Sequence, residues 1–242
     1  MFFFSPLEQF DVIYIFNLYG FDISNIVFFF FFINLILLLF IFFFKGYLFS
    51  ISLFQYFFEL VYFFILEIII QQAGVNGLFF FPFAFIVFFF IMLSNLIGML
   101  PFSFTITAHL CLTFFLAFSF NFSFIILGFI KNGIHFLLLF KPQGTPVFLL
   151  PLIIVIEVVS YLIRTFSLSI RLFANMMAGH CLLYVISSFV FTLLSVNIYL
   201  SIPLVLIYGG IFLLEFAIAL IQAYVFTILL CIYLNDSLHP GH

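Results

Sequence analysis

The chain has 242 residues, of which 68% are hydrophobic and 5% are charged, and its formal net charge is −3. Soluble domains carry about a quarter charged residues, so this composition excludes a water-soluble globular fold. No block of basic residues gives a reason to expect a nucleic-acid partner. The sequence therefore predicts an all-α integral membrane protein that forms a single membrane domain over residues 1–242.

Three apolar runs predict membrane-spanning helices. They cover residues 26–44, 78–100 and 108–130, and they approach or reach the roughly 17–25 residues that cross a hydrocarbon core. An N-terminal segment over 1–25 precedes them. It carries acidic rather than basic residues, so neither a cleavable signal nor an Arg-rich transit peptide is expected.

The segment 50–70 differs from these runs because polar residues recur along it. Gln55, Glu59, Glu67 and Gln71 are separated by four or eight residues, which places them on nearby faces of one helix. This spacing favours an amphipathic helix at the membrane surface over a full span.

Two over-long apolar segments close the chain. After a predicted re-entrant or surface connection at 131–146, the segment 152–196 contains no proline and one glycine, Gly179. Its length is about 70 Å at about 1.5 Å per residue, against about 30 Å for a bilayer core. It must therefore be strongly tilted or bent near Gly179. The segment 198–234 is also over-long, with Pro203 as one place to bend.

The orientation follows from the few lysines outside the predicted spans. Lys45, Lys131 and Lys141 fall on one side if the three shorter spans each cross once and the segment 50–70 does not cross. By the positive-inside rule, that side is the matrix or cytoplasm. The N-terminus then faces the opposite compartment, and the segment 152–196 travels outward.

Ionisable residues inside the two long segments are the best candidates for functional residues. An Arg at the bilayer centre costs about 3 kcal/mol on insertion scales, so its presence there needs a reason. Glu157, Arg164 and Arg171 are seven residues apart and share one helical stripe. Asn175 lies one turn from Arg171, whereas His180 points to the opposite face.

These residue types suit proton transfer. Carboxylates and His exchange protons, whereas Arg stays charged in proteins. Glu215 and Gln222 are seven residues apart, so both can face the preceding helix across a hairpin. Proton-exchanging groups thus lie on both sides of the fixed charge of Arg171. This layout predicts a split proton path.

Structural alternatives stay open at this point. Glu157 could be half of an ion pair with Arg164 or Arg171, and Arg164 is the better candidate for a purely structural role. His180 could be a packing residue. The remaining histidines are expected to be exposed to solvent at segment ends or in loops: His109, His135, His239 and His242.

No cofactor or metal is expected. Cys111, Cys181 and Cys231 show no paired or metal-type spacing and are interpreted as packing residues. A redox subunit of the respiratory chain would need paired axial histidines, and no two histidines share one predicted helix. A secondary transporter would need related halves, and the two halves here look dissimilar.

Four motifs resemble the F-type ATP synthase a subunit. They are SPLEQF at Ser5–Phe10, SNLIGMLPFSFT at Ser94–Thr105, SYLIRTFSLSIRLFANMMAGH at Ser160–His180 and LEFAIALIQAYVFTILLCIYLND at Leu214–Asp236. The resemblance covers essentially the whole chain. It implies four to five spanning helices, one amphipathic helix at the matrix surface, and a final pair of long helices lying steeply tilted against a rotor ring.

The resemblance also implies roles for particular residues. Arg171 matches an essential arginine that faces the rotor carboxylate. The proton path would comprise Asn95, Glu157, Asn175, His180, Glu215 and Gln222. Thr165 departs from the family pattern, in which many members have Pro, and a straighter helix is expected there.

Partners and location follow from the same resemblance. The implied partners are the c-ring, the peripheral stalk, other membrane-sector subunits, lipids and protons. His at 180 with Glu at 215 looks like the mitochondrial pattern, which predicts a multi-pass protein of the mitochondrial inner membrane. ATP chemistry would occur on other subunits, since the chain has no GxxxxGK[ST] phosphate loop.

Overall fold

The computed structural model describes residues 8–18, 21–46, 53–100, 103–140, 148–196 and 198–238. α-Helices dominate these residues, as the composition predicts, because backbone polar groups in a bilayer core must be satisfied within the segment. The elements in chain order are η1 (Glu8–Phe10), β1 (Tyr14–Leu18), β2 (Phe21–Ser24), α1 (Asn25–Gly46), α2 (Leu53–Ala73), η2 (Val75–Phe80), α3 (Phe81–Gly98), η3 (Ile106–Ala108), α4 (Leu110–Asn132), η4 (Gly133–Phe140), α5 (Leu150–Val196) and α6 (Ile198–Leu238), where η marks a 3-10 helix.

Four helical stretches are long and apolar enough to cross a membrane. They are Gly77–Gly98, Leu110–Leu137, Leu150–Ser195 and Ser201–Leu238. The all-α membrane architecture is thereby confirmed. The predicted first span corresponds to α1, whose described apolar stretch, Asn25–Leu39, is shorter than these four.

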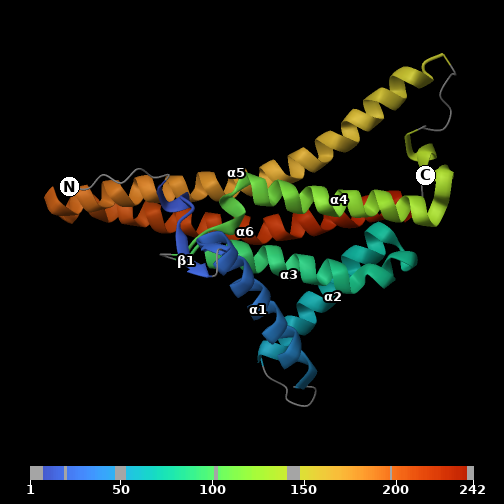
Figure 1. The fold of residues 1–242 in the computed structure, drawn as a ribbon. Helices are drawn as coiled ribbons and strands as arrows, with labels where there is room; N and C mark the ends of the chain where they lie inside the picture. Colours follow the sequence, from blue (N-terminus) through green and yellow to red (C-terminus); the bar gives the residue numbers. More distant parts are fainter. Residues whose placement is uncertain are drawn as a thin grey trace.

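The long helices pack into one bundle. Figure 1 shows α3, α4, α6 and the later part of α5 running alongside one another, and α6 contacts α2, α3, α4 and α5. The main core lies along α3 and the C-terminal half of α6, where Phe89, Ile91, Phe226 and Leu234 are almost fully buried. This bundle fixes the inner faces of α5 and α6.

α5 is one continuous helix of 47 residues. It runs without interruption through Thr165 and Gly179, and its first part slopes away from the bundle in Figure 1. Thr165 is buried, and its hydroxyl accepts a hydrogen bond from the side-chain amide of Asn121 on α4. A buried polar bridge therefore ties α5 to α4 at this position.

α2 has one buried face and one exposed face. Ile65, Ile68 and Ile69 are buried, whereas Glu59 and Glu67 lie on the exposed side. The Gln71 side-chain amide donates to Glu67 Oε1 at 3.1 Å. Because polar groups on α2 pair with one another outside the bundle, the helix can lie at a membrane surface.

The N-terminal segment contains a structure that the sequence analysis did not predict. β1 and β2 form an antiparallel pair, with Asn17 opposite Asp22, and the Asn17 side chain donates to Asp22 Oδ1 at 2.6 Å. β-Branched and aromatic residues in Val12–Phe16 favour strand over helix. The hairpin is the exception to the helical architecture among the described residues.

The connection predicted at 131–146 is partly helical. α4 continues through Lys131 to Asn132, and η4 follows directly; residues 141–147, with Lys141, lie outside the described residues. Gly133 allows this change of direction, because its φ of 56° is readily adopted only by glycine. The Asn132 side chain donates to the carbonyl of Ser237 at 2.9 Å, which ties the connection to the end of α6.

Candidate functional site

The polar residues predicted on α5 and α6 contact one another at two positions along the pair of helices. His180 Nε2 lies 3.8 Å from Glu215 Oε1, and the Asn175 side-chain amide donates to Gln222 Oε1 at 3.1 Å. The seven-residue spacing of Glu215 and Gln222 places both on the face of α6 that contacts α5. Glu215 and Gln222 are buried.

Asn95 joins this group from α3. Its side chain is fully buried, and its amide donates to the carbonyl of Ala219 at 3.3 Å. Ala219 lies on α6 between Glu215 and Gln222. The structure thus brings together five of the predicted residues: Asn95, Asn175, His180, Glu215 and Gln222.

Several polar atoms in this group are buried without a hydrogen-bond partner among the described residues. They are Asn95 Oδ1, His180 Nε2, Gln222 Nε2 and both carboxyl oxygens of Glu215. Buried polar atoms are normally paired with protein or water. Polar atoms of this kind are thus concentrated between α3, α5 and α6.

Gly179 makes room for the Glu215 carboxyl. A Cβ atom at position 179 would lie 2.6 Å from Glu215 Oε1 and 2.8 Å from its Cδ. The glycine in α5 therefore permits the close approach of the two helices at the carboxyl. Its role is steric access, since α5 does not bend into two helices there.

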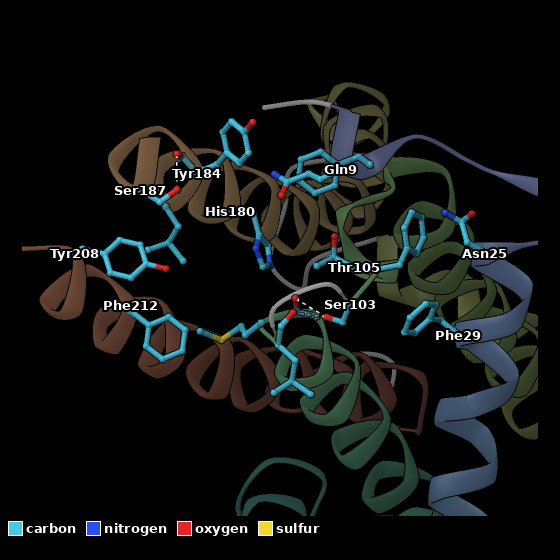
Figure 2. A pocket seen from close by; sticks show the side chains of 16 residues that line it. Gln9, Asn25, Phe29, Ser103, Thr105, His180, Tyr184, Ser187, Tyr208 and Phe212 are labelled. Atoms are coloured by element: carbon cyan, nitrogen blue, oxygen red, sulfur yellow. Dashed lines mark hydrogen bonds between the residues drawn. The ribbon is translucent and has the colours of Figure 1, made fainter. Parts of the chain in front are cut away.

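A pocket opens on the His180 side of the group. It has a volume of about 930 Å³, and its polar lining includes Gln9, Ser103, Thr105, Tyr184 and Tyr208. Figure 2 shows His180 pointing into this pocket from α5, with Tyr208 and Phe212 reaching in from α6. The imidazole thus lies between the pocket and the buried Glu215 carboxyl.

A second group of charges lies near the other end of α5. Arg164 is 3.6 Å from Glu157 Oε1 and 3.5 Å from Asp236 Oδ2 on α6. Of the two ion pairs left open by the sequence, the structure forms the one with Arg164. The side chains of Glu157 and Asp236 are about one-third exposed, at 33% and 32%, so the described residues do not enclose them fully.

Asp236 was missed by the sequence analysis, although a signal was present. It lies 21 residues after Glu215, three repeats of the same seven-residue spacing, and so belongs to the same stripe of α6. The pocket-lining residues Gln9, Ser103 and Tyr208 were also missed. They come from three separate parts of the chain, and no local pattern connects them.

Arg171 lies between the two groups and is exposed on the surface of α5. It forms no salt bridge with another described residue. Along the helix it is about 21 Å from Glu157 and about 13 Å from His180, at about 1.5 Å per residue. A positive charge therefore faces outward between two groups of titratable and polar side chains.

The prediction that His109 is solvent-exposed is wrong. Its ring is half-buried and stacks on Phe104, with 4.9 Å between ring centroids. Burial lowers the pKa of His109, which keeps the ring neutral near pH 7. His135 is exposed, and His239 and His242 lie outside the described residues.

On the split proton path expected from the sequence, Gly179→Ala should reduce proton conduction by about tenfold, because the added methyl must displace the Glu215 carboxyl, and small misplacements of reacting groups are costly. The rate is measured as proton flux into vesicles. Gly210→Ala is the matched control, since a Cβ there meets no heavy atom within 4 Å. Equal rates for the two variants would contradict the steric role of Gly179.

Comparison with known proteins agrees with the geometry. The sequence model of the family described as "ATP synthase A chain" matches residues 26–235. The "ATP synthase subunit a" of Acanthamoeba castellanii is 43% identical over 245 residues, covering 99% of both chains. The proteins of the same name from Nitrobacter winogradskyi and Xanthobacter autotrophicus are 48% and 46% identical over 188 residues, covering 76% of this chain and 76% and 75% of theirs.

The buried polar groups between the long helices, the outward-facing arginine and these similarities lead to one assignment. The chain belongs to the ATP synthase subunit a family, the proton-translocating subunits of the membrane sector of ATP synthase.

Proposed function

We propose that this chain provides two offset proton half-paths that are separated by Arg171. One observation carries the proposal: the proton-exchanging residues fall into two groups at different heights along α5, with the exposed Arg171 between them. On this proposal, a proton that enters at one group and leaves at the other passes between them on a carrier outside this chain.

In the outer half-path, protons enter through the pocket of about 930 Å³ beside His180. His180 passes the proton to Glu215, and Asn95 holds the water that links the buried oxygens. The support is the 3.8 Å separation of His180 and Glu215 and the unpaired buried atoms around them. Carboxylate and imidazole are the usual groups for such transfers.

In the inner half-path, protons leave past Asp236 and Glu157. Arg164 holds both carboxylates in place through its two ion pairs. Because both acids are partly exposed, they can exchange protons with water in the compartment on that side. Arg164 acts as a positioning residue here, whereas Arg171 acts on the proton carrier.

The carrier is a carboxylate on a rotating ring of partner subunits, the c-ring. Arg171 is exposed among apolar residues such as Ile170 and Ile163, and a charge in an apolar membrane surface requires a counter-charge. The arginine keeps the carrier ionised between the half-paths. Each proton releases about 2.3 kcal/mol per 100 mV of membrane potential, which turns the ring.

We further propose that the complex lies in the mitochondrial inner membrane, with the pocket facing the intermembrane space and the Arg164 cluster facing the matrix. The near-complete coverage of the Acanthamoeba protein supports this location. The peripheral stalk, other membrane-sector subunits and lipids would cover the exposed apolar faces of α1 and α2. Catalysis of ATP synthesis takes place on other subunits.

A sided labelling experiment tests the two half-paths. The variants Ser187→Cys and Ser160→Cys each introduce one thiol near one of the two groups. Ser187 lines the pocket, and Ser160 lies one helical turn from Glu157. A charged, membrane-impermeant thiol reagent should stop conduction through Ser187→Cys only when added on the pocket side. It should stop conduction through Ser160→Cys only when added on the opposite side.

Phe191→Cys on the same helix is the control, because Phe191 is 74% exposed and lies outside the pocket. The unsubstituted chain reports any effect at its native cysteines. If one side of addition blocked both variants, the two groups would share a single channel, and the proposal of offset half-paths would fail.

A further inference from the structure

The described end of the SPLEQF motif, Glu8–Phe10, lies against the site although the proposed proton path assigns it no role. The Phe10 ring meets the His180 ring edge-on, with 6.4 Å between centroids and an interplanar angle of 74°. Phe10 also packs against the small buried cluster of Met99, Ala108, Met176 and Ala219. An aromatic residue near the chain start thus touches the histidine of the outer half-path.

Hydrogen bonds at the start of α1 hold this segment in place. The Asn25 side chain donates to the carbonyl of Asp11 at 3.1 Å and accepts from the backbone N–H of Ile13 at 3.3 Å. The backbone N–H of Asn25 donates to the carbonyl of Ile13 at 3.0 Å, and that of Asp11 donates to the carbonyl of Glu8 at 3.1 Å. These hydrogen bonds therefore fix the segment that carries Phe10 to the start of α1.

Among the described residues, no hydrogen bond holds the His180 side chain in a comparable way. Its Nε2 has no hydrogen-bond partner among the described residues, and the 3.8 Å to Glu215 Oε1 is longer than a hydrogen bond. Direct proton transfer requires about 2.6–3.2 Å between heavy atoms, or one bridging water. The open volume beside the ring, about 930 Å³, gives it room to turn away from Glu215.

We propose that Phe10 is a positioning residue for His180, holding the imidazole on the Glu215 side of the pocket by edge-to-face contact. This inference rests on the proposed outer half-path. The contact suits the task because aromatic rings prefer edge-to-face geometry at centroid separations of about 4.5–7 Å. The N-terminal segment is thereby part of the proton-uptake site.

Proton conduction by the assembled complex in vesicles tests the proposal. Phe10→Ala should lower the rate by about tenfold, since misplacing a reacting group is costly, and Phe10→Tyr, which keeps the ring, should retain at least about half of it. Val12→Ala is the matched control in the same segment, because Val12 is 45% exposed. If Phe10→Ala conducts as fast as Val12→Ala, the positioning role is refuted.

Two further arms separate this inference from the proposed function. If His180→Ala loses conduction while Phe10→Ala keeps it, only the role of Phe10 fails; if neither loses it, the outer half-path fails as well. Should Phe10→Ala not assemble, Phe10→Leu replaces it, filling the space without an aromatic ring. Faster carbethoxylation of His180 by diethylpyrocarbonate in that variant would support the proposal, and an unchanged rate would overturn it.

Discussion

Arg171→Ala is expected to abolish coupled ATP synthesis in assembled complexes, with a loss of at least about 100-fold. Once the proposed ring covers this surface, the substitution leaves the ring carboxylate without its counter-charge, which costs about 3–5 kcal/mol, at about 1.36 kcal/mol per tenfold in rate. Because Arg171 also separates the half-paths, passive proton leakage should persist. The measurements are ATP synthesis and proton flux in the same vesicles.

Arg171→Lys sharpens this test. Lysine keeps a positive charge but can lose its proton when buried, whereas arginine stays charged. The lysine variant should therefore remain strongly impaired although its charge at neutral pH is formally unchanged. Assembly of the complex must be verified for both variants. Normal ATP synthesis by assembled Arg171→Ala would show that the arginine is only structural and that the split path is wrong.

Glu215→Gln should reduce proton flux by about 100-fold or more, the range of general acid–base contributions. Glutamine preserves the shape of the side chain beside Gly179 but cannot exchange a proton. In contrast to Arg171→Ala, this variant should lose passive conduction and ATP synthesis together. Proton uptake driven by an imposed potential is the direct measurement.

Glu67→Gln is the matched control for this carboxyl. Glu67 lies on the exposed side of α2 and accepts a hydrogen bond from Gln71, away from both half-paths. The complex with Glu67→Gln should conduct protons at the same rate as the complex with the unsubstituted chain. Full conduction by Glu215→Gln would remove Glu215 from the path and leave His180 without a buried acceptor.

Local pattern and composition decided the membrane location and the helical segments. In a bilayer core the backbone N–H and C=O groups must pair with one another, so a long run of apolar residues is sufficient to predict a helix. The seven-residue spacings placed Glu157 and Arg164 on one face of α5, and Glu215 and Gln222 on one face of α6, because each pair lies within a single helix. The same rule, applied further, would have found Asp236.

The tertiary structure decided which helical faces meet. Arg164 pairs with Asp236 across 72 residues, and Asn95 reaches Ala219 across 124 residues. The contact of Phe10 with His180 and the space that Gly179 leaves for Glu215 likewise depend on how the helices pack. Periodicity fixes where a side chain points on its own helix. The tilt and register between helices arise from the summed packing of the whole bundle, which no local stretch of sequence contains.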